Sequence, residues 1–558
     1  MDTQRLVLFM VFAFSVFFLL EAWQKDKQSA APVGAPPAIS GPAGAPPAVS
    51  GPVAAPVPTP TQPLSATPAA APPVASSGLQ HGATVRVETD VYVAEIDTVG
   101  GDLRRLELLG HRDTLDGSKN FILFQNGPEH VYVAQSGLIG SGLPNHRTAY
   151  TAAVGDVKLE PGADKVSARL SVPLAAGVSV TKVYTFHRGS YLIDVGYELE
   201  NKSAAAINPS AYYQLIRDGK APAGDSAMLP TYTGLAVYTD KDKFQKVPFG
   251  DVDKGKINYP TKSNDGWIAV LQHYFLSAWL PPVNTPREFY TRRGDDGLYS
   301  AGVILSLGSI EPGGHAAVTV GLYAGPQEQD SLSKLAPGLD LTVDYGSLTI
   351  IAKPIFWFLQ WLHHWIGNWG VAIIILTVII KAMFYPLSAA SYRSMAKMRM
   401  LAPRMQKMKE QFGADRQKLN QAMMELYKTE HINPLGGCLP IIVQIPVFIS
   451  LYWVLLASVE LRHAPFALWI HDLSAKDPYY VLPVLMGATM VFQTYLNPEP
   501  PDPVQAKVMK IMPIAFSIMF LFFPAGLVLY WLINNILSIA QQWQITRSME
   551  HAKPAHGK

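Results

Sequence analysis

The sequence contains little cysteine and carries little net charge. Cys438 is the only cysteine among 558 residues, and the formal net charge is +2. A single thiol cannot form an internal disulfide, so any exported part must be held together by its own core. No GxxxxGK[ST] phosphate loop, no HExxH zinc helix and no Cys/His cluster with metal-ligand spacing occurs. We therefore expect no enzyme activity and no cofactor, and the charge does not indicate bulk nucleic-acid binding.

Apolar residues are concentrated at the N-terminus and after Ile350. The first run, Leu6 to Leu20, follows Arg5, and residues 3–23 reach the ~20 residues that a membrane span needs. The run leads into Glu21-Ala-Trp-Gln24 without a small-x-small cleavage site. We expect an uncleaved transmembrane anchor at residues 1–23 rather than a signal peptide.

Residues 24–80 have a different composition, rich in Ala, Pro, Gly and Ser. An imperfect ten-residue repeat begins at Gly34 and again at Gly44. Such a segment has few large apolar groups whose burial could offset the entropy lost on ordering. The composition predicts a disordered, semi-extended tether, and a ligand tract for a partner is the alternative.

From residue 81 to residue 343 the apolar pattern has a period of two. Ile193, Val195, Tyr197 and Leu199 alternate with mostly polar neighbours, and glycine-containing turns recur between such runs. This pattern is typical of a large antiparallel β-sandwich. About 260 residues can bury a substantial core without disulfides.

Residues 344–366 combine aromatic and basic side chains. Trp357, Trp361 and Trp365 lie beside Lys353 and His363. Aromatic rings with polar tips favour the membrane interface. We expect an amphipathic helix on the membrane surface, and a buried amphipathic helix is the alternative.

Five further apolar segments predict transmembrane helices at residues 367–387, 434–459, 479–497, 508–523 and 527–546. The last two are separated only by Pro524-Ala-Gly526, so they form a helical hairpin. With the anchor, the predicted fold is a six-span α-helical membrane bundle carrying one large β-sandwich outside the membrane.

The distribution of charge predicts the orientation. Residues 388–433 carry nine Lys/Arg and four acidic residues, whereas residues 460–478 carry two Lys/Arg and three acidic residues. By the positive-inside rule, the first loop is cytoplasmic and the second is outside. The loop 498–507, the tail 547–558 and both termini then lie inside, and the β domain lies outside.

The cytoplasmic loop 388–433 is itself expected to be a helical hairpin. A basic helix from Ser388 to Phe412 is interrupted at Gly413-Ala414, and Asp415 can cap a second helix from Arg416 to Thr429. Seven of the 17 methionines lie here, which suits a surface that accepts varied apolar partners. The alternative is that they pack the two helices together. The candidate recruitment residues of this loop are Arg399, Arg404, Lys407, Met405 and Met408.

One charged residue follows a long apolar run. Lys381 comes after residues 371–380, in which only Thr377 is polar. A charge near mid-bilayer costs roughly 2.5–3.5 kcal/mol, so it usually faces a wet cavity or a partner. Snorkelling to the cytoplasmic surface is the alternative. Thr377 lies one turn earlier on the same helix face, so the two can form a polar stripe.

Several long motifs, in this order, resemble the YidC/Oxa/Alb insertase family. They are Gly367-Asn-Trp-Gly370, Met383-Phe-Tyr-Pro-Leu387, Ser394-Met-Ala-Lys-Met-Arg-Met400, Asn433-Pro-Leu-Gly-Gly-Cys-Leu-Pro440, Ala464-Pro-Phe-Ala-Leu-Trp-Ile-His-Asp-Leu473 and Pro524-Ala-Gly-Leu-Val-Leu-Tyr530. Gly266-Trp-Ile-Ala-Val-Leu-Gln-His-Tyr-Phe275 and Leu339-Asp-Leu-Thr-Val-Asp-Tyr345 resemble the Gram-negative form of the family, which has a large periplasmic domain.

The resemblance implies a five-span core in the bacterial inner membrane that inserts integral membrane proteins and helps them fold, alone or with the Sec translocon. The implied partners are nascent membrane proteins, the Sec translocon and the ribosome–nascent-chain complex. The basic loop and the tail could also contact ribosomal RNA or anionic lipid.

The resemblance also implies a hydrophilic cationic groove, open to cytoplasm and lipid. Its candidate residues are Lys381, Thr377, Gln444 and Asn534. The family usually has an arginine where this chain has Lys381, which keeps the charge but loses the planar five-donor fork. A substrate helix would slide along the third and fifth spans past Ile445, Phe448, Phe516 and Phe520.

Two other classes of function remain as alternatives. A transporter or channel needs polar groups through the whole bilayer, whereas these segments are polar only in parts and show no inverted repeat. The predicted β-sandwich is similar to mutarotase-like sandwiches, so a carbohydrate-binding envelope protein is the second alternative, although a fold does not imply a function.

Overall fold

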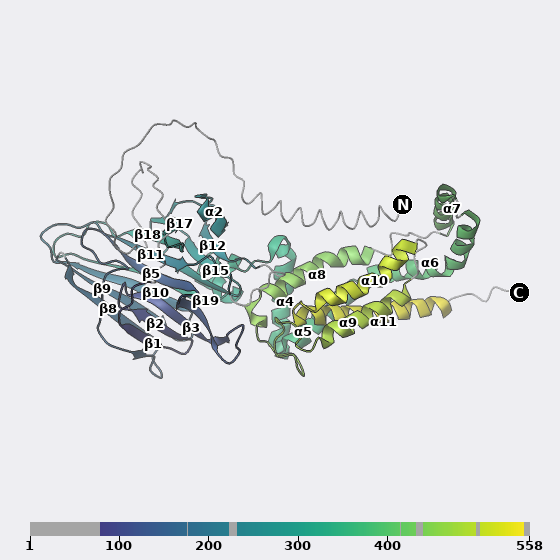
Figure 1. Ribbon diagram of the computed structural model, residues 1–558, viewed down its shortest axis with the longest axis horizontal. Helices are drawn as coiled ribbons and strands as arrows, with labels where there is room; N and C mark the ends of the chain where they lie inside the picture. Colours follow the sequence, from purple (N-terminus) through teal and green to yellow (C-terminus); the bar gives the residue numbers. More distant parts are fainter. Residues whose placement is uncertain are drawn as a thin grey trace, which may run out of the picture. The chain divides into compact units, whose positions relative to one another are not determined.

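The computed structural model describes residues 79–175, 177–222, 231–412, 415–430, 439–497 and 503–551. These residues form two compact units that divide between Val343 and Asp344 (Figure 1). The predicted anchor at 1–23, most of the tether and the tail from residue 552 lie outside the described residues.

The first unit consists of two β-sheets, and all of their strand pairings are antiparallel except that of β1 with β7. The ten-stranded sheet has the order β14 (Lys262–Ser263), β17 (Arg287–Arg293), β18 (Tyr299–Ser306), β11 (Ser210–Arg217), β5 (Val131–Ile139), β4 (Asn120–Asn126), β3 (Asp102–Arg112), β2 (Tyr92–Asp97), β1 (Thr84–Glu88) and β7 (Val157–Lys158). The nine-stranded sheet has the order β13 (Lys243–Val247), β12 (Gly234–Thr239), β15 (Trp267–Gln272), β16 (Phe275–Leu280), β19 (His315–Pro326), β10 (Leu192–Asn201), β9 (Val178–His187), β8 (Lys165–Ala175) and β6 (Thr151–Ala152). Short helices are α2 (Phe249–Asp253), α3 (Gln329–Leu335) and η1 (Leu339–Thr342).

The alternating pattern of β10 explains how the sheets pack. Ile193, Val195, Tyr197 and Leu199 are buried and belong to one core cluster that also contains residues of the ten-stranded sheet. The strand predicted from this alternation is confirmed, because β10 pairs along its length with β9 and β19. Since each inward side chain of one sheet meets the other sheet, the apolar core lies between the two layers.

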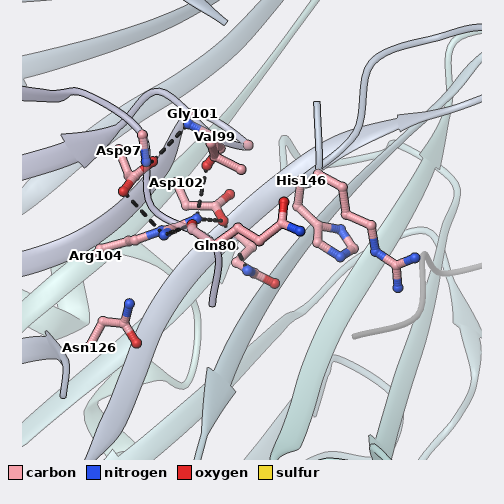
Figure 2. A network of polar contacts seen from close by, with 12 residues as sticks. Gln80, Asp97, Val99, Gly101, Asp102, Arg104, Asn126 and His146 are labelled. Atoms are coloured by element: carbon pink, nitrogen blue, oxygen red, sulfur yellow. Dashed lines mark hydrogen bonds and ion pairs between the residues drawn. The ribbon is translucent and has the colours of Figure 1, made fainter. Parts of the chain in front are cut away.

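A buried polar network crosses the ten-stranded sheet, and Figure 2 shows part of it. Arg104 on β3 donates to Asp97 at 3.1 Å and lies 3.7 Å from Asp102. Gln135 donates to Asp102 at 2.9 Å, and Gln214 donates to Gln135 at 2.9 Å. These side chains come from β2, β3, β5 and β11, so the network joins strands that are distant in sequence.

Lys182 brings a charge from the other sheet into this region. Its ammonium group donates to the carbonyls of Gly100 at 3.1 Å and Ser136 at 3.3 Å. The rings of Tyr184 and Tyr197 lie 5.4 and 5.6 Å from it, close enough for cation–π attraction. Burial lowers the pKa of Lys182 to about 8, although the carboxylate of Asp102 opposes this shift.

This network generates a prediction about pH. Burial raises the pKa of Asp102 to about 7, against opposing effects of Lys182, Arg104 and Gln135. The folded protein therefore keeps a proton that the unfolded chain releases near pH 4, and this stabilisation is lost as pH rises toward 7. Between pH 4 and 7, the free energy of unfolding of the unchanged protein should fall by about 2–4 kcal/mol more than that of the Asp102→Asn variant. Denaturation of the purified full chain at several pH values measures it.

The control for this measurement is Asp164→Asn, which removes an exposed carboxylate of the same unit. Its pH profile should follow that of the unchanged protein. Parallel profiles for Asp102→Asn and the unchanged protein would contradict the assignment of a buried, proton-binding carboxyl group.

The second unit is helical. Its elements are η2 (Gly346–Leu348), α4 (Thr349–Ile366), α5 (Trp369–Met383), α6 (Tyr385–Phe412), α7 (Arg416–Thr429), α8 (Leu439–Ala457), η4 (Val459–Leu461), α9 (Val481–Leu496), α10 (Pro503–Phe520) and α11 (Ala525–His551). Helix α11 packs against α5, α6 and α9, α4 packs against α5 and α8, and α10 packs against α9 (Figure 1).

Helix α4 has two different faces. Phe356, Leu359 and Leu362 are buried, whereas Trp357 and Trp365 are exposed. The buried face packs against α5 and α8, as the alternative of a buried amphipathic helix requires. The exposed tryptophans lie on the other face, and the placement of that face at the membrane interface stays a prediction.

By length and apolar composition, no single described helix qualifies as a membrane span. Helix α5 together with the beginning of α6, up to Leu401, qualifies as a pair bent by 66°.

Candidate functional site

A break after α5 places the only charged side chain of that helix near its end. Pro386 lacks an N–H, and in a continuous helix its ring would clash with the carbonyl of Ala382. The helix ends at Met383, and the Phe384 N–H closes the last turn on the Ile380 carbonyl at 3.1 Å. Lys381 therefore lies in the last turn of α5, where the carbonyl ends of the helix favour a positive charge.

Lys381 is buried against α11. It is 4% exposed, and its ammonium group donates to the hydroxyl of Ser538 at 2.7 Å. The Ser538 hydroxyl in turn donates to the carbonyl of Asn534 at 2.7 Å. Within the described ranges no carboxylate forms an ion pair with Lys381. The site is therefore a cation that is removed from water and bound by a hydroxyl group. It has no counter-ion among the described residues.

Thr377 lies one turn before Lys381 on the same face of α5. It is 1% exposed, and its hydroxyl donates to the Ile373 carbonyl of its own helix at 2.7 Å. Because this bond satisfies the hydroxyl donor within α5, Thr377 can lie among apolar neighbours while its oxygen keeps a free lone pair.

Helix α6 adds polar groups that the sequence did not single out. Ser388, Ser391 and Tyr392 are buried, and Tyr392 interacts with Ser538. Tyr392 also packs with Ile545 of α11. Ser538 was recognisable only as one of several polar residues, although it follows Asn534 by one turn and therefore shares its helix face.

The other two predicted groove residues are only half-buried. Asn534 contributes its backbone carbonyl to the Ser538 hydroxyl. Gln444 lies on α8, and in the part of the chain that the structure describes no hydrogen bond joins it to Lys381. The structure thus brings Lys381, Ser538 and Asn534 together, but leaves Gln444 outside this hydrogen-bonded group.

The predicted slide residues differ in accessibility. Ile445 is 44% exposed, whereas Phe520 is 1% exposed. Phe448 and Phe520 both contact the ring of Trp531, with centroids 4.5 and 5.5 Å apart, and Phe516 stacks on Phe520. The aromatic cluster around Trp531 thus joins α8, α10 and α11, and Phe520 supports that surface from inside.

Helices α6 and α7 occupy the segment for which a helical hairpin is predicted. Helix α7 runs from Arg416 to Thr429, and the Asp415 side chain caps it by accepting from the N–H groups of Gln417 and Lys418. Helix α6 begins at Tyr385, three residues before the predicted start.

The candidate recruitment residues of α6 differ in their exposure to solvent. Arg399, Arg404 and Lys407 are exposed, whereas Met405 and Met408 are half-buried. Arg404 also forms an ion pair with Glu430 at 2.8 Å. The two methionines fit the packing alternative, while Met400 and Met424 remain exposed.

Several residues of the sequence motifs form hydrogen bonds and close contacts at the end of the helical unit where α5 and α11 begin. Asn368 caps α5 by accepting from the Val371 N–H at 3.0 Å and donates to the Phe466 carbonyl at 2.9 Å. A Cβ on Gly370 would meet the Phe466 ring, so only glycine allows this close approach. The loop between α8 and α9 also binds the first turn of α11, because the Gly526 N–H donates to the Leu473 carbonyl at 2.9 Å.

Comparison with known protein families gives two matches that together cover most of the chain. Residues 84–358 match the YidC periplasmic domain, and residues 361–553 match the 60Kd inner membrane protein model. The membrane protein insertase YidC of Nitrosospira multiformis is 57% identical, over 99% of this chain and 98% of that protein. The chain belongs to the YidC family of membrane protein insertases.

A second relative agrees with this assignment. The membrane protein insertase YidC of Aromatoleum aromaticum is 56% identical over the full length of both chains. A YidC insertase crystal structure with its first transmembrane domain resolved is 19% identical, with a TM-score of 0.40, over 83% of this chain and 93% of that chain. A galactose mutarotase related enzyme from Lactobacillus acidophilus is 10% identical, with a TM-score of 0.30, over 43% and 97%. As a YidC family member, the chain combines a β-rich periplasmic domain with a helical C-terminal region.

The loop between α8 and α9, which contains Asp477, leads to a prediction about stability. Asp477 is buried and accepts hydrogen bonds from the Trp469 indole at 3.0 Å, the Tyr479 N–H at 3.0 Å and the Leu482 N–H at 2.7 Å. Asp477→Ala leaves these three donors, of which the Leu482 N–H is buried, without their acceptor and should cost about 2–4 kcal/mol. Thermal unfolding of the purified full chain in detergent measures the loss.

The matched control is Lys476→Ala, because Lys476 is the exposed neighbour of Asp477. It should unfold within a degree or two of the unchanged protein. Equal unfolding temperatures for the two variants would contradict the role given to Asp477.

Proposed function

We propose that this YidC family member inserts membrane proteins by holding the acidic polar part of a nascent segment at Lys381 while the apolar part enters the lipid. The observation that carries the proposal is the buried ammonium group of Lys381, which is bound by the Ser538 hydroxyl and has no carboxylate partner within the described residues. A carboxylate from a substrate would complete this incomplete site.

Electrostatics supports such a transient pair. Two unit charges 4 Å apart attract by about 4 kcal/mol at an effective dielectric constant of 20. This is similar to the roughly 2.5–3.5 kcal/mol that a carboxylate costs at the centre of a membrane helix. Lys381 can therefore offset much of the cost of bringing an acidic tail into the bilayer, without binding it so strongly that release becomes slow.

Lysine performs this role differently from arginine. Its ammonium group is a compact charge with rotatable donors, and it lacks the planar fork that binds a carboxylate through two parallel bonds. We infer that attraction at Lys381 depends on charge and distance rather than on fixed bidentate geometry.

The apolar part of the substrate follows α8 and α10 in this proposal. Exposed apolar side chains on these helices include Ile445, Ile511, Ile514 and Ile518. Phe448 of α8 and Phe520 of α10 both pack against Trp531 of α11, so this ring connects the two helices. Partitioning of the substrate helix into lipid supplies the free energy, so no nucleotide is required.

Orientation and partners belong to the same proposal. Both termini and the hairpin of α6 and α7 are cytoplasmic, in agreement with the charge distribution. The exposed Arg399 and Lys407 would meet the ribosome–nascent-chain complex or anionic lipid, and the Sec translocon would receive or deliver shared substrates.

Replacing Lys381 tests the electrostatic step. Lys381→Ala should slow the insertion of a substrate with an acidic tail about tenfold, equivalent to about 1.4 kcal/mol in the barrier, because the attracting charge is lost. Lys381→Arg should retain most of the rate. Protease protection of a radiolabelled substrate in inverted membrane vesicles measures both.

The control is the same substrate with its acidic residues replaced by Asn or Gln. Its insertion should be nearly independent of the residue at position 381. Equal slowing of both substrates by Lys381→Ala would indicate a structural role and would contradict the proposal.

Photo-crosslinking tests the slide. A photoreactive amino acid at Ile445 should capture an arrested nascent chain, because this side chain is exposed. The same probe at Phe520 should capture it at least severalfold less, since Phe520 is packed against Trp531. Equal capture at the two positions, or capture at Phe520 alone, would contradict the path along α8 and α10.

A further inference from the structure

A cleft of about 320 Å³ lies between α9 and α11 and takes no part in the proposed insertion step. It is lined mainly by Leu485, Ala488 and Phe492 of α9 and Leu532, Ile536 and Ile539 of α11. Hydrogen bonds join the two helices beside it, from Asn535 to Thr489 at 3.4 Å and from Gln542 to the Leu496 carbonyl at 3.1 Å. Because these bonds fix the spacing of the helices, the cleft is preformed.

The face of α11 that lines the cleft continues toward the C-terminal end of the helix, beyond the cleft itself. Leu532, Ile536, Ile539, Trp543 and Arg547 fall within about 80° of one another around the helix axis. The distance from Leu532 to Trp543 along that axis is about 16 Å. The hydrocarbon of one leaflet is about 15 Å deep. The apolar part of this face therefore has the length of one lipid acyl layer.

The polar end of the same face has the features of a headgroup site. Trp543 is 57% exposed, as expected at the boundary between hydrocarbon and headgroups. The exposed guanidinium group of Arg547 lies 5.2 Å from the Trp543 ring centroid. No carboxylate pairs with Arg547 among the residues that the structure describes. A cation therefore lies one turn beyond an exposed tryptophan, in the order along the helix that a hydrocarbon boundary followed by a headgroup site requires.

We propose that this face binds one anionic phospholipid, with an acyl chain in the cleft between α9 and α11 and the phosphate at Arg547. The apolar lining, the leaflet-length spacing and the cation one turn beyond Trp543 favour this occupant. A neutral phospholipid offers the same chains but gains less from Arg547, because its headgroup carries a compensating positive charge. The lipid would occupy the leaflet that contains the C-terminal end of α11.

Lipid binding by the delipidated full chain tests the proposal. Native mass spectrometry would measure the first binding step of phosphatidylglycerol and of phosphatidylcholine with the same acyl chains. Phosphatidylglycerol should bind more tightly, and Arg547→Gln should weaken it about fivefold, the factor expected for one cation at an anionic membrane surface. Arg547→Lys should retain most of the affinity. Ala488→Trp, which fills the cleft, should weaken both lipids.

The matched control is Lys507→Gln, which removes an exposed cation of α10. It should leave the first binding step unchanged. Equal affinity for the two lipids, or equal losses in Lys507→Gln and Arg547→Gln, would overturn the proposal. Insertion assays on Lys381 variants do not measure this step, so failure here is distinguishable from failure of the insertion mechanism.

A photoreactive amino acid at Ile536 in native membranes tests the occupant directly. Crosslinks to phospholipid would support the proposal. Crosslinks mainly to residues 3–23 of the chain, to a second copy or to a nascent substrate would show that a protein segment occupies the cleft, and would overturn it.

Discussion

The central constraint in the helical unit is the burial of one ammonium group. Lys381 is buried between α5 and α11 and is solvated there by the Ser538 hydroxyl. An uncompensated charge in such surroundings is costly, so the site favours any carboxylate that can reach it. The break at Pro386 and the alignment of Ser538 with Asn534 on α11 create this environment. The proposed insertion step depends on the same shortage of negative charge.

Hydrogen bonds connect the loops at the opposite end of the helical unit. There Asn368 donates to the Phe466 carbonyl and Gly526 donates to the Leu473 carbonyl, which connects the loop between α8 and α9 to the starts of α5 and α11. Asp477 accepts from the Leu482 N–H at the start of α9. These bonds hold the helices at fixed spacing. This connected end and the buried ammonium group of Lys381 are complementary, because a site that attracts substrate transiently needs a rigid frame around it.

Much of the fold follows from the sequence, since β10 and α7 are set by local periodicity and by the Asp415 cap. Interactions between distant residues could not be predicted in this way. The charge of Lys381 was evident, but its partner Ser538 lies 157 positions later. Phe520 and Ile445 are both apolar residues in predicted spans, yet only packing around Trp531 buries the first. The Asp102–Gln135–Gln214 network was equally invisible, because its members belong to strands paired by topology.

The most direct test follows the acidic residue of a substrate through the membrane. A photoreactive amino acid at Asn534, one turn from Ser538, would be combined with arrested chains whose single acidic residue is moved stepwise along the tail. We expect the crosslinked substrate position to move with the acidic residue, because Lys381 holds the carboxylate beside the probe. Crosslinks that stay at a fixed chain length regardless of the acidic residue would contradict it.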